Sequence, residues 1–305
     1  MRIVVAGGSG FIGKHLISAL LQDAHSVVVL TRSVHTIAPR PGSLSTAQWD
    51  ARTPGDWIHV VDGADAIVNL TGESIAGKRW TRRQKDRIVS SRVDSTRALV
   101  SAIERAHRRP SVLINASGVD IYNDVLQGDV TEAGQVGKDF LARVCAEWEA
   151  NALEAERLGV RVVTPRLGVV LARDGGALTK LTTPFRFFVG GYVGSGRQWF
   201  PWVHIDDVAN AFIFLLKNSD LKGAVNLAAP QHVTMKEFTK ILGQVLHRPS
   251  WTTVPSFALR LALGEMAEML LTGQRVVPRR LQQAGFAFEY ETLRSALINL
   301  AERRT

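Results

Sequence analysis

The chain has 305 residues, of which 46% are hydrophobic and 21% charged, a composition typical of globular proteins. No tract of about eighteen uncharged apolar residues occurs, so we expect no membrane-spanning helix. The net charge of +9 is compatible with an anionic partner, but no helix-turn-helix, zinc-finger or RNA-binding signature accompanies the basic residues, so we do not expect nucleic acid to bind.

The beginning of the chain and its single cysteine indicate a reducing compartment. The apolar run Ile3–Ala6 stands where an export signal would have its basic region, so we expect the protein in the cytoplasm. Cys145 alone excludes an internal disulfide and a cysteine-based zinc cage. Because Cys145 lies on an apolar helical stripe, we interpret it as a core residue rather than a nucleophile.

The first thirty residues predict a strand, a glycine turn, a helix and a second strand. Arg2–Ala6 and Ser26–Leu30 are rich in β-branched residues, and Phe11–Gln22 has apolar residues at helical spacing. This order is a βαβ unit.

Further short apolar runs alternate with helical segments. The predicted strands are Ala66–Leu70, Val112–Ala116 and Val160–Thr164, and the predicted helices are Arg83–Ala106 and Asp139–Leu158. Strands and helices alternating at this spacing predict a Rossmann-type α/β fold, a doubly wound parallel sheet with right-handed crossovers.

The pattern changes after about Pro165. Residues 166–204 are rich in glycine and aromatic residues and predict loops, after which Ile205–Leu216 and Met235–Leu246 predict helices and Ala224–Leu227 a strand. From about Val254 the chain is helical, with glycines as breaks.

These segments predict two interleaved domains. Residues 1–165, with 205–230 returning to them, form the nucleotide-binding domain. Residues 166–204 and 231–305 form a smaller, mostly helical substrate domain. No low-complexity linker separates the two.

The glycines after the first strand follow the spacing G-x-x-G-x-x-G. Such a turn reverses sharply, lets a pyrophosphate approach the backbone, and directs the N-terminus of the next helix at the phosphates. The residues predicted to hold the phosphates are Gly7, Gly10, Phe11, Ile12 and Gly13.

The end of the second strand favours NADP over NAD. NAD sites usually place a carboxylate there for the ribose hydroxyls, whereas this chain has Thr31, Arg32 and Ser33. Arg32 is able to pair with a 2′-phosphate in bidentate fashion. Asp50, after a third predicted strand, either accepts from the adenine amine or is an ordinary loop carboxylate.

Several longer motifs carry a family resemblance. Besides the glycine turn, they are Asn69–Gly77, Lys78–Trp80, Ser91–Arg92, Gly194–Trp199, His204–Asp207 and Gly273–Pro278. Together they resemble the epimerase-like family of extended short-chain dehydrogenases/reductases, which has its own small C-terminal domain, and the resemblance covers nearly the whole chain.

The resemblance implies an NADP-binding Rossmann domain with contacts at the carboxyl ends of several strands. The residues that it assigns to the dinucleotide are Thr31, Arg32, Leu70, Thr71, Gly72, Arg92 and Val169. The ends of parallel strands at a switch point are where a ligand is expected on physical grounds as well.

The usual proton relay of short-chain dehydrogenases is absent from the sequence. That relay is a Tyr-x-x-x-Lys pair, in which the lysine lowers the tyrosine pKa. None of Tyr122, Tyr192 and Tyr290 has a lysine four residues later, and the helix that should carry the pair reads Phe140–Val144.

Two hydroxyls near the end of the fifth strand are the candidate catalytic groups. Ser117 stands where related enzymes place a catalytic serine, and Tyr122 follows five residues later. The alternatives are a strand-end hydroxyl that caps backbone groups and a half-buried loop aromatic.

Polar residues near the chain's second glycine-rich loop allow two interpretations each. His204, Asp206 and Asp207 more readily anchor a loop and the next helix than bind a metal, because no third ligand has a recognisable spacing. Arg197 either grips an anionic substrate or pairs with Asp206 or Asp207.

The sequence therefore leaves three hypotheses. The first is an NADP(H)-dependent oxidoreductase or epimerase acting on an unidentified small substrate between the two domains. The second is a non-catalytic NADP sensor or scaffold, favoured by the missing Tyr-Lys pair. The third, a cell-division interaction protein, follows only from labels given to some relatives. Neither substrate nor oligomeric state follows from the sequence.

Overall fold

The structure, a computed structural model, describes residues 1–34 and 37–302. Its central sheet is parallel, in the order β3–β2–β1–β4–β5–β8–β12. The strands are β1 (Arg2–Ala6), β2 (Ser26–Thr31), β3 (Leu44–Gln48), β4 (Ala66–Asn69), β5 (Val112–Asn115), β8 (Arg161–Leu167) and β12 (Gly223–Leu227), with β6 (Ser117–Gly118) paired beside β8. The predicted doubly wound α/β fold is confirmed.

The strand order contains a topological switch point between β1 and β4. The chain runs outward from β1 to β2 and β3, and then returns to the other side of β1 with β4. At such a switch point the loops leaving β1 and β4 separate, and ligands bind outside the carboxyl ends of the strands. The register aligns Ala6 with Leu30 and Asn69, so the three strands end level with one another.

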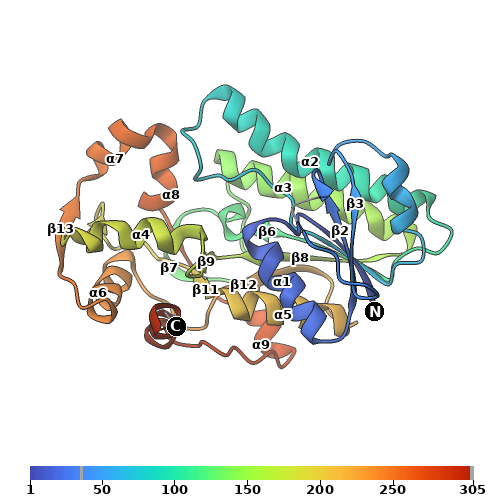
Figure 1. The fold of residues 1–305 in the computed structure, drawn as a ribbon. Helices are drawn as coiled ribbons and strands as arrows, with labels where there is room; N and C mark the ends of the chain where they lie inside the picture. Colours follow the sequence, from blue (N-terminus) through green and yellow to red (C-terminus); the bar gives the residue numbers. More distant parts are fainter. Residues whose placement is uncertain (35–36, 303–305) are drawn as a thin grey trace.

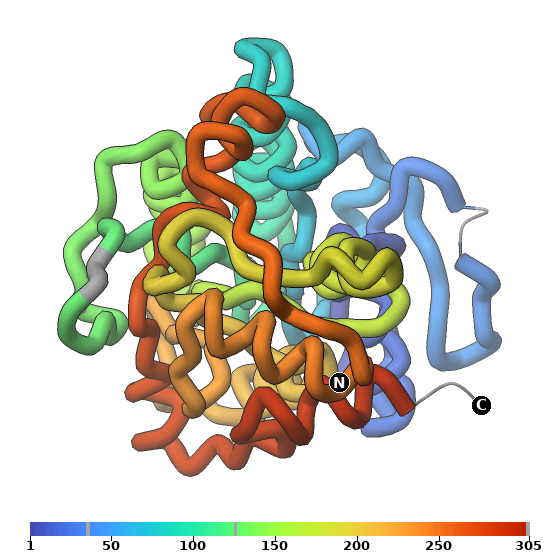
Figure 2. The backbone as a smooth tube through the Cα atoms, turned by 90° about the vertical axis from the view of Figure 1, so that its left-hand side faces the viewer, coloured from blue at the N-terminus to red at the C-terminus, as the bar shows by residue number. Residues whose placement is uncertain are grey.

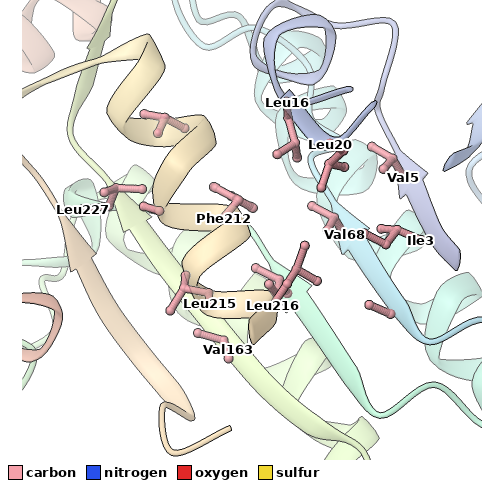
Figure 3. Packing of buried hydrophobic residues seen from close by; sticks show 14 of the residues in the cluster. Ile3, Val5, Leu16, Leu20, Val68, Val163, Phe212, Leu215, Leu216 and Leu227 are labelled. Carbon is pink, nitrogen blue, oxygen red and sulfur yellow. The ribbon is translucent and has the colours of Figure 1, made fainter. Parts of the chain in front are cut away.

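Helices cover both faces of the sheet (Figure 1). α1 (Phe11–Gln22) and α5 (Ile205–Lys217) pack together on one face, and α2 (Arg82–Arg105) and α3 (Phe140–Leu153) on the other. Figure 3 shows Leu16 and Leu20 of α1 and Phe212 of α5 directed at the sheet. All three side chains are fully buried, as the apolar stripe of an amphipathic helix requires.

Shorter elements fill the loops of the sheet. The 3-10 turns are η2 (Asp56–Val60), η3 (Val119–Ile121), η4 (Glu154–Leu158) and η5 (Gly264–Ala267). The remaining strands are β7 (Val125–Val130), β9 (Val169–Leu171), β10 (Gly190–Val193), β11 (Trp202–His204), β13 (Ser250–Val254) and β14 (Gln274–Val276). The remaining helices are α4 (Gly176–Arg186), α6 (Met235–Val245), α7 (Ser256–Leu263), α8 (Glu268–Leu271), α9 (Arg279–Gln283) and α10 (Leu293–Glu302).

The segments α4, α6, α7 and α8 lie beyond the end of the sheet opposite the N-terminus. Because β1 begins at Arg2, this end carries the carboxyl edge of the strands (Figure 1). In Figure 2, turned by 90°, the same yellow and orange segments lie in front of the sheet. Within the described residues no helix has the length and apolarity needed to cross a membrane.

Several elements depart from the predicted pattern. Residues 166–204 were expected as loops, but they contain strands β9, β10 and β11, and Gly176–Arg186 is helix α4 even though it contains Pro184. Its buried residues Leu178 and Phe185 are seven positions apart, a helical spacing that the flanking glycines obscured. The expected helical C-terminal part is interrupted by β14, which pairs with β7.

Candidate functional site

The turn after β1 is closed by contacts that only glycine permits. Gly7 has φ +78°, and a Cβ there would lie 2.7 Å from the carbonyl carbon and oxygen of Leu70. A Cβ on Gly13 would lie 2.5 Å from the Gly7 carbonyl oxygen. These are backbone atoms that cannot move aside, so the turn, the end of β4 and the start of α1 require glycine at both positions.

The N-terminus of α1 lacks the side-chain cap that several other helices have. Thr81, Asp139 and Thr234 accept hydrogen bonds from the first turns of α2, α3 and α6. The N-cap of α1 is Gly10, with no side-chain hydrogen bond and no acidic residue in the first turn. The first N–H groups of a helix lack acceptors within the helix, so this terminus is suited to bind an anion.

The aromatic ring of Phe11, the first residue of α1, packs on the loop after β9. A Cβ on Gly175 or Gly176 would lie 2.8 or 2.9 Å from that ring. His15 on the same helix pairs with Asp174 at 3.0 Å. The turn is therefore held between β4 on one side and the 174–176 loop on the other.

At the end of β2, Thr31 is buried and Arg32 is exposed. The Thr31 hydroxyl donates to the Ser33 carbonyl (3.1 Å) and accepts from the Ser33 N–H (3.2 Å), which fixes the bend. Asp50, after β3, accepts three hydrogen bonds from Arg52 and Thr53. The Thr53 hydroxyl, first among these, lowers the pKa of Asp50, which agrees with its interpretation as a loop carboxylate.

The turn after β4 is shaped by Asn69. Its Oδ1 accepts from the N–H (3.1 Å) and the hydroxyl (2.5 Å) of Thr71. Its Nδ2 donates to Asn115 Oδ1 (2.7 Å) and Thr96 Oγ1 (3.0 Å). Asn69 and Asn115 are fully buried at the ends of adjacent strands. Leu70, Thr71 and Gly72 consequently leave the sheet along a fixed path beside the glycine turn.

Arg92 reaches this turn from α2. Its Nη1 donates to the carbonyls of Glu73 and Ile88, both at 3.1 Å, and its guanidinium lies 5.1 Å from the Trp148 ring centroid. A Cβ on Gly72 would lie 3.0 Å from Cζ of Arg92. Burial lowers the pKa of Arg92 from its usual value.

A buried network holds both candidate catalytic hydroxyls. Ser117 Oγ donates to Glu149 Oε1 (2.6 Å), and Arg166 donates to both Glu149 oxygens at 2.8 Å each. Arg166 also donates to the Tyr122 hydroxyl (2.8 Å), which donates to Asn226 Oδ1 (2.5 Å). Burial raises the pKa of Tyr122. The structure therefore brings Ser117 and Tyr122 together, through Arg166 and Glu149.

Asp120 lies between these two residues in η3 and is half-buried. Burial, reinforced by the charge of Asp139, raises the pKa of Asp120 to about 6. The charge of Arg92 and the residue's own N–H oppose that shift. A Cβ on Gly118 would lie 3.3 Å from Asp120 Oδ2 and 3.6 Å from Cys145 Sγ, so both side chains lie beside this glycine.

Cys145 is a core residue, as predicted. It is buried in the cluster formed with Val119, Ile121 and Tyr122. Burial raises the pKa of its thiol to about 12, so the thiol stays protonated at neutral pH.

The anchoring role predicted for the His204–Asp207 motif is confirmed. His204 Nδ1 accepts from the Asp206 N–H (3.1 Å) at the start of α5, and its ring stacks on Tyr290 with centroids 3.8 Å apart. Asp207 accepts from the N–H groups of Glu289 (2.7 Å) and Tyr290 (3.1 Å). These contacts fasten the C-terminal segment to α5.

Arg197 and Val169 belong to the segments that follow β8. Arg197 is exposed in the loop between β10 and β11, and forms no ion pair with a residue in 1–34 or 37–302. Val169 is half-buried at the start of β9, and its N–H donates to the Pro201 carbonyl (2.7 Å).

Sequence reasoning missed Glu149, Arg166 and Asn226. A signal for two of them was present: Arg166 interrupts an apolar strand, and Glu149 lies on the apolar stripe of α3. A charged residue in a segment that is otherwise buried indicates a paired charge.

Comparison with known proteins agrees with this geometry. Residues 3–228 match the family described as "NAD dependent epimerase/dehydratase family", and residues 254–300 match a domain of unknown function, DUF1731. The "Epimerase family protein SDR39U1 homolog, chloroplastic" of Arabidopsis thaliana is 42% identical over 97% of this chain and 86% of its own length. Epimerase family protein YfhF of Bacillus subtilis is 37% identical over the full length of both chains.

A solved structure supports the same relationship. The human epimerase family protein SDR39U1 (isoform 2), crystallised with NADPH, superposes with a TM-score of 0.88. It is 34% identical, and the match covers 99% of both chains. This chain therefore belongs to the NAD-dependent epimerase/dehydratase family and carries a DUF1731 domain at its C-terminal end.

Proposed function

We propose that this protein is an NADP(H)-dependent oxidoreductase or epimerase that acts on a small substrate. The observation that carries the proposal is the pair Gly7 and Gly13, whose missing Cβ atoms let β1, β4 and α1 meet beside an uncapped helix N-terminus. That cradle suits a pyrophosphate, because it offers backbone N–H groups and admits close approach.

The proposed dinucleotide lies along the carboxyl edge of the sheet. Gly10, Phe11, Ile12 and Gly13 hold the phosphates through the first turn of α1. The segment Leu70–Gly72 and Arg92 line the middle of this edge, and Val169 borders its nicotinamide end. When bound, the nicotinamide supplies or accepts a hydride.

The preference for NADP rests on the end of β2. Arg32 is exposed directly after the strand that neighbours the glycine turn, and neither Thr31 nor Ser33 offers a carboxylate to the ribose. A guanidinium pairs with a phosphate through two hydrogen bonds. The NADPH in the human SDR39U1 structure supports the same assignment, because that protein is similar over its whole length.

The proposed substrate lies between the carboxyl edge and the C-terminal segments, with residues 1–165 and 205–230 on the nucleotide side. Arg197 is exposed and has no acidic partner in the described part of the chain, which favours a substrate with an anionic group. The catalytic site of this proposal contains Ser117 and Tyr122. The proposed compartment is the cytoplasm.

A second candidate function is a non-catalytic NADP sensor. The observation that favours it is that both candidate hydroxyls already serve the Arg166–Glu149 network. Moving either hydroxyl to a substrate would leave a buried charged group with fewer hydrogen bonds.

The two functions are separated by measuring binding and turnover in the same preparation. NADPH binding is followed by quenching of tryptophan fluorescence. Turnover is followed as NADPH oxidation with a panel of aldehydes and ketones, and as formation of the epimeric product with nucleotide-sugars, because an epimerase consumes no net NADPH. Gly13→Ala is the control, since it should abolish binding and turnover together. NADPH binding together with turnover of one substrate class supports the enzymatic function. NADPH binding without turnover of any substrate supports the sensor function. Absence of NADPH binding contradicts both.

A further inference from the structure

The proposed function needs a group that moves a proton beside the nicotinamide, and the usual Tyr-Lys pair is absent. Ser117 and Tyr122 hydrogen-bond to the buried Arg166–Glu149 pair and Asn226. Because this network holds both hydroxyls in place, they are suited to position the substrate oxygen, and another group at the same strand end is needed to supply the proton.

Most carboxylates near this edge have a structural contact. Asp139 accepts from the Ala142 N–H at the start of α3, and Asp50 from three donors in its own loop. Other carboxylates that accept hydrogen bonds from elsewhere in the chain include Glu73, Asp124, Glu132 and Glu149. Each of these carboxylates is therefore committed to holding the fold.

Asp120 differs from all of them. Within residues 1–34 and 37–302 its carboxylate receives a hydrogen bond only from its own backbone N–H. It is half-buried rather than exposed, and its Oδ2 lies close to Gly118 at the end of β6, where an added Cβ would be 3.3 Å away. A carboxyl group in this position has a hydrogen-bonding site available for a ligand.

We propose that Asp120 is the residue that donates and accepts the proton at the substrate oxygen. The inference rests on the proposed function, because it requires the nicotinamide to lie at the end of β5 and β6. In the reducing direction the Asp120 carboxyl gives its proton to the substrate carbonyl oxygen while the carbonyl carbon takes the hydride from NADPH. The C=O double bond becomes C–H and O–H, NADP⁺ remains, and water reprotonates the carboxylate.

The surroundings of Asp120 suit this role. From α2 it faces Arg92, and from α3 it faces Asp139 and the protonated thiol of Cys145. The cation of β8, Arg166, is already paired with Glu149 and leaves Asp120 without a strong partner. Burial and the negative charge of Asp139 raise the pKa of Asp120 to about 6, so both its forms are populated near neutral pH, as an acid and base requires.

A test without a known substrate compares the affinities for NADP⁺ and NADPH between pH 5 and pH 8. The oxidised nicotinamide is positively charged and the reduced one is neutral, whereas their phosphates are identical. The ratio of the two affinities therefore reports a charge near the ring. With Asp120 beside the ring, the preference for NADP⁺ should rise about tenfold as the pH passes through 6.

Asp120→Asn should remove this pH dependence and leave NADPH affinity within about twofold of the wild type. Asp86→Asn, an exposed carboxylate on α2, is the matched control and should keep the wild-type curve. Asp120→Ala provides a second variant if the first is unstable. A wild-type ratio that does not change with pH, or one that changes equally in Asp120→Asn, overturns the assignment while the cofactor proposal stands. If neither nucleotide binds, the proposed function and this inference both fall.

Discussion

The glycine turn after β1 and the buried network beside β8 are held in place by different interactions. At the glycine turn, Gly7 and Gly13 place backbone against backbone, and these closest contacts involve no charged side chain. In the buried network, Arg166, Glu149 and their partners form a set of charge-assisted hydrogen bonds. The glycine turn depends on the missing Cβ atoms of Gly7 and Gly13. The buried network depends on every hydrogen-bonding side chain around Arg166 being present. Substitutions should therefore affect binding at the glycine turn and stability in the buried network.

The largest effect is expected from adding one methyl group to the turn. Gly13→Ala places a Cβ 2.5 Å from the Gly7 carbonyl oxygen, so the turn must open and NADPH affinity should fall by at least about a hundredfold. Titration calorimetry measures this. Gly55→Ala is the control, since its Cβ meets nothing closer than 3.5 Å, and its affinity should be unchanged. Equal affinities of Gly13→Ala and wild type would show that the turn does not hold the phosphates.

The next effect concerns the stability of the buried network. Arg166→Met leaves Glu149 buried without its ion pair, and should lower the free energy of unfolding by about 3–5 kcal/mol. Urea unfolding measures the loss, and Arg166→Met with Glu149→Leu should recover much of it. Arg157→Met, in the exposed pair with Glu154, should cost less than about 1 kcal/mol. A similar small loss for Arg166→Met would mean that the network is not a stabilising element.

A smaller effect is expected at Asp120, which, unlike Glu149, forms no ion pair in the described part of the chain. The pKa of Asp120 is raised to about 6 in the folded chain, above its ordinary value of 3.8. Its stabilising contribution is therefore complete below about pH 4 and is lost as the pH rises through 6. At pH 8 the free energy of unfolding of Asp120→Asn, measured with urea, should exceed that of the wild type by on the order of 1 kcal/mol. This difference should shrink toward pH 4. If the difference in the free energy of unfolding grew toward acidic pH, the pKa of Asp120 would be lowered in the folded chain and not raised.

The smallest effect is expected at Cys145. Because burial raises the pKa of its thiol to about 12, the folded protein should react with an aromatic disulfide reagent at pH 8 far more slowly than a free thiol. Unfolding in urea should release one reactive thiol per chain. Rapid labelling of the folded protein would place the sulfur at the surface instead.

The contrast between the two regions also explains what the sequence predicts well. The glycine turn is local, since strand, glycines and amphipathic helix follow one another within Arg2–Gln22, and their spacing indicates the geometry directly. The pairing of Arg166 with Glu149 joins β8 to α3 across seventeen positions, and Tyr122 meets Asn226 across 104. No periodicity predicts which distant polar residues meet. The family motifs predict which residues bind ligands, but not that Ser117 and Tyr122 belong to one hydrogen-bonded network.

Helix α4 was missed for a related reason. Gly175 and Gly176 resemble a loop signal, yet they are needed because Phe11 of the glycine turn packs on them. A glycine that serves a distant contact is indistinguishable in sequence from one that serves a local turn.

The measurement that tests the central claim most directly is the paired affinity for NADPH and NADH, in the wild type and in Arg32→Ala. Tryptophan quenching gives all four dissociation constants, with Arg87→Ala on α2 as the exposed arginine control. We predict that the wild type prefers NADPH by about ten- to a hundredfold, and that only Arg32→Ala loses this preference while keeping its NADH affinity. Equal binding of NADPH and NADH by the wild type, or an unchanged preference in Arg32→Ala, would contradict the assignment of the end of β2 to the 2′-phosphate.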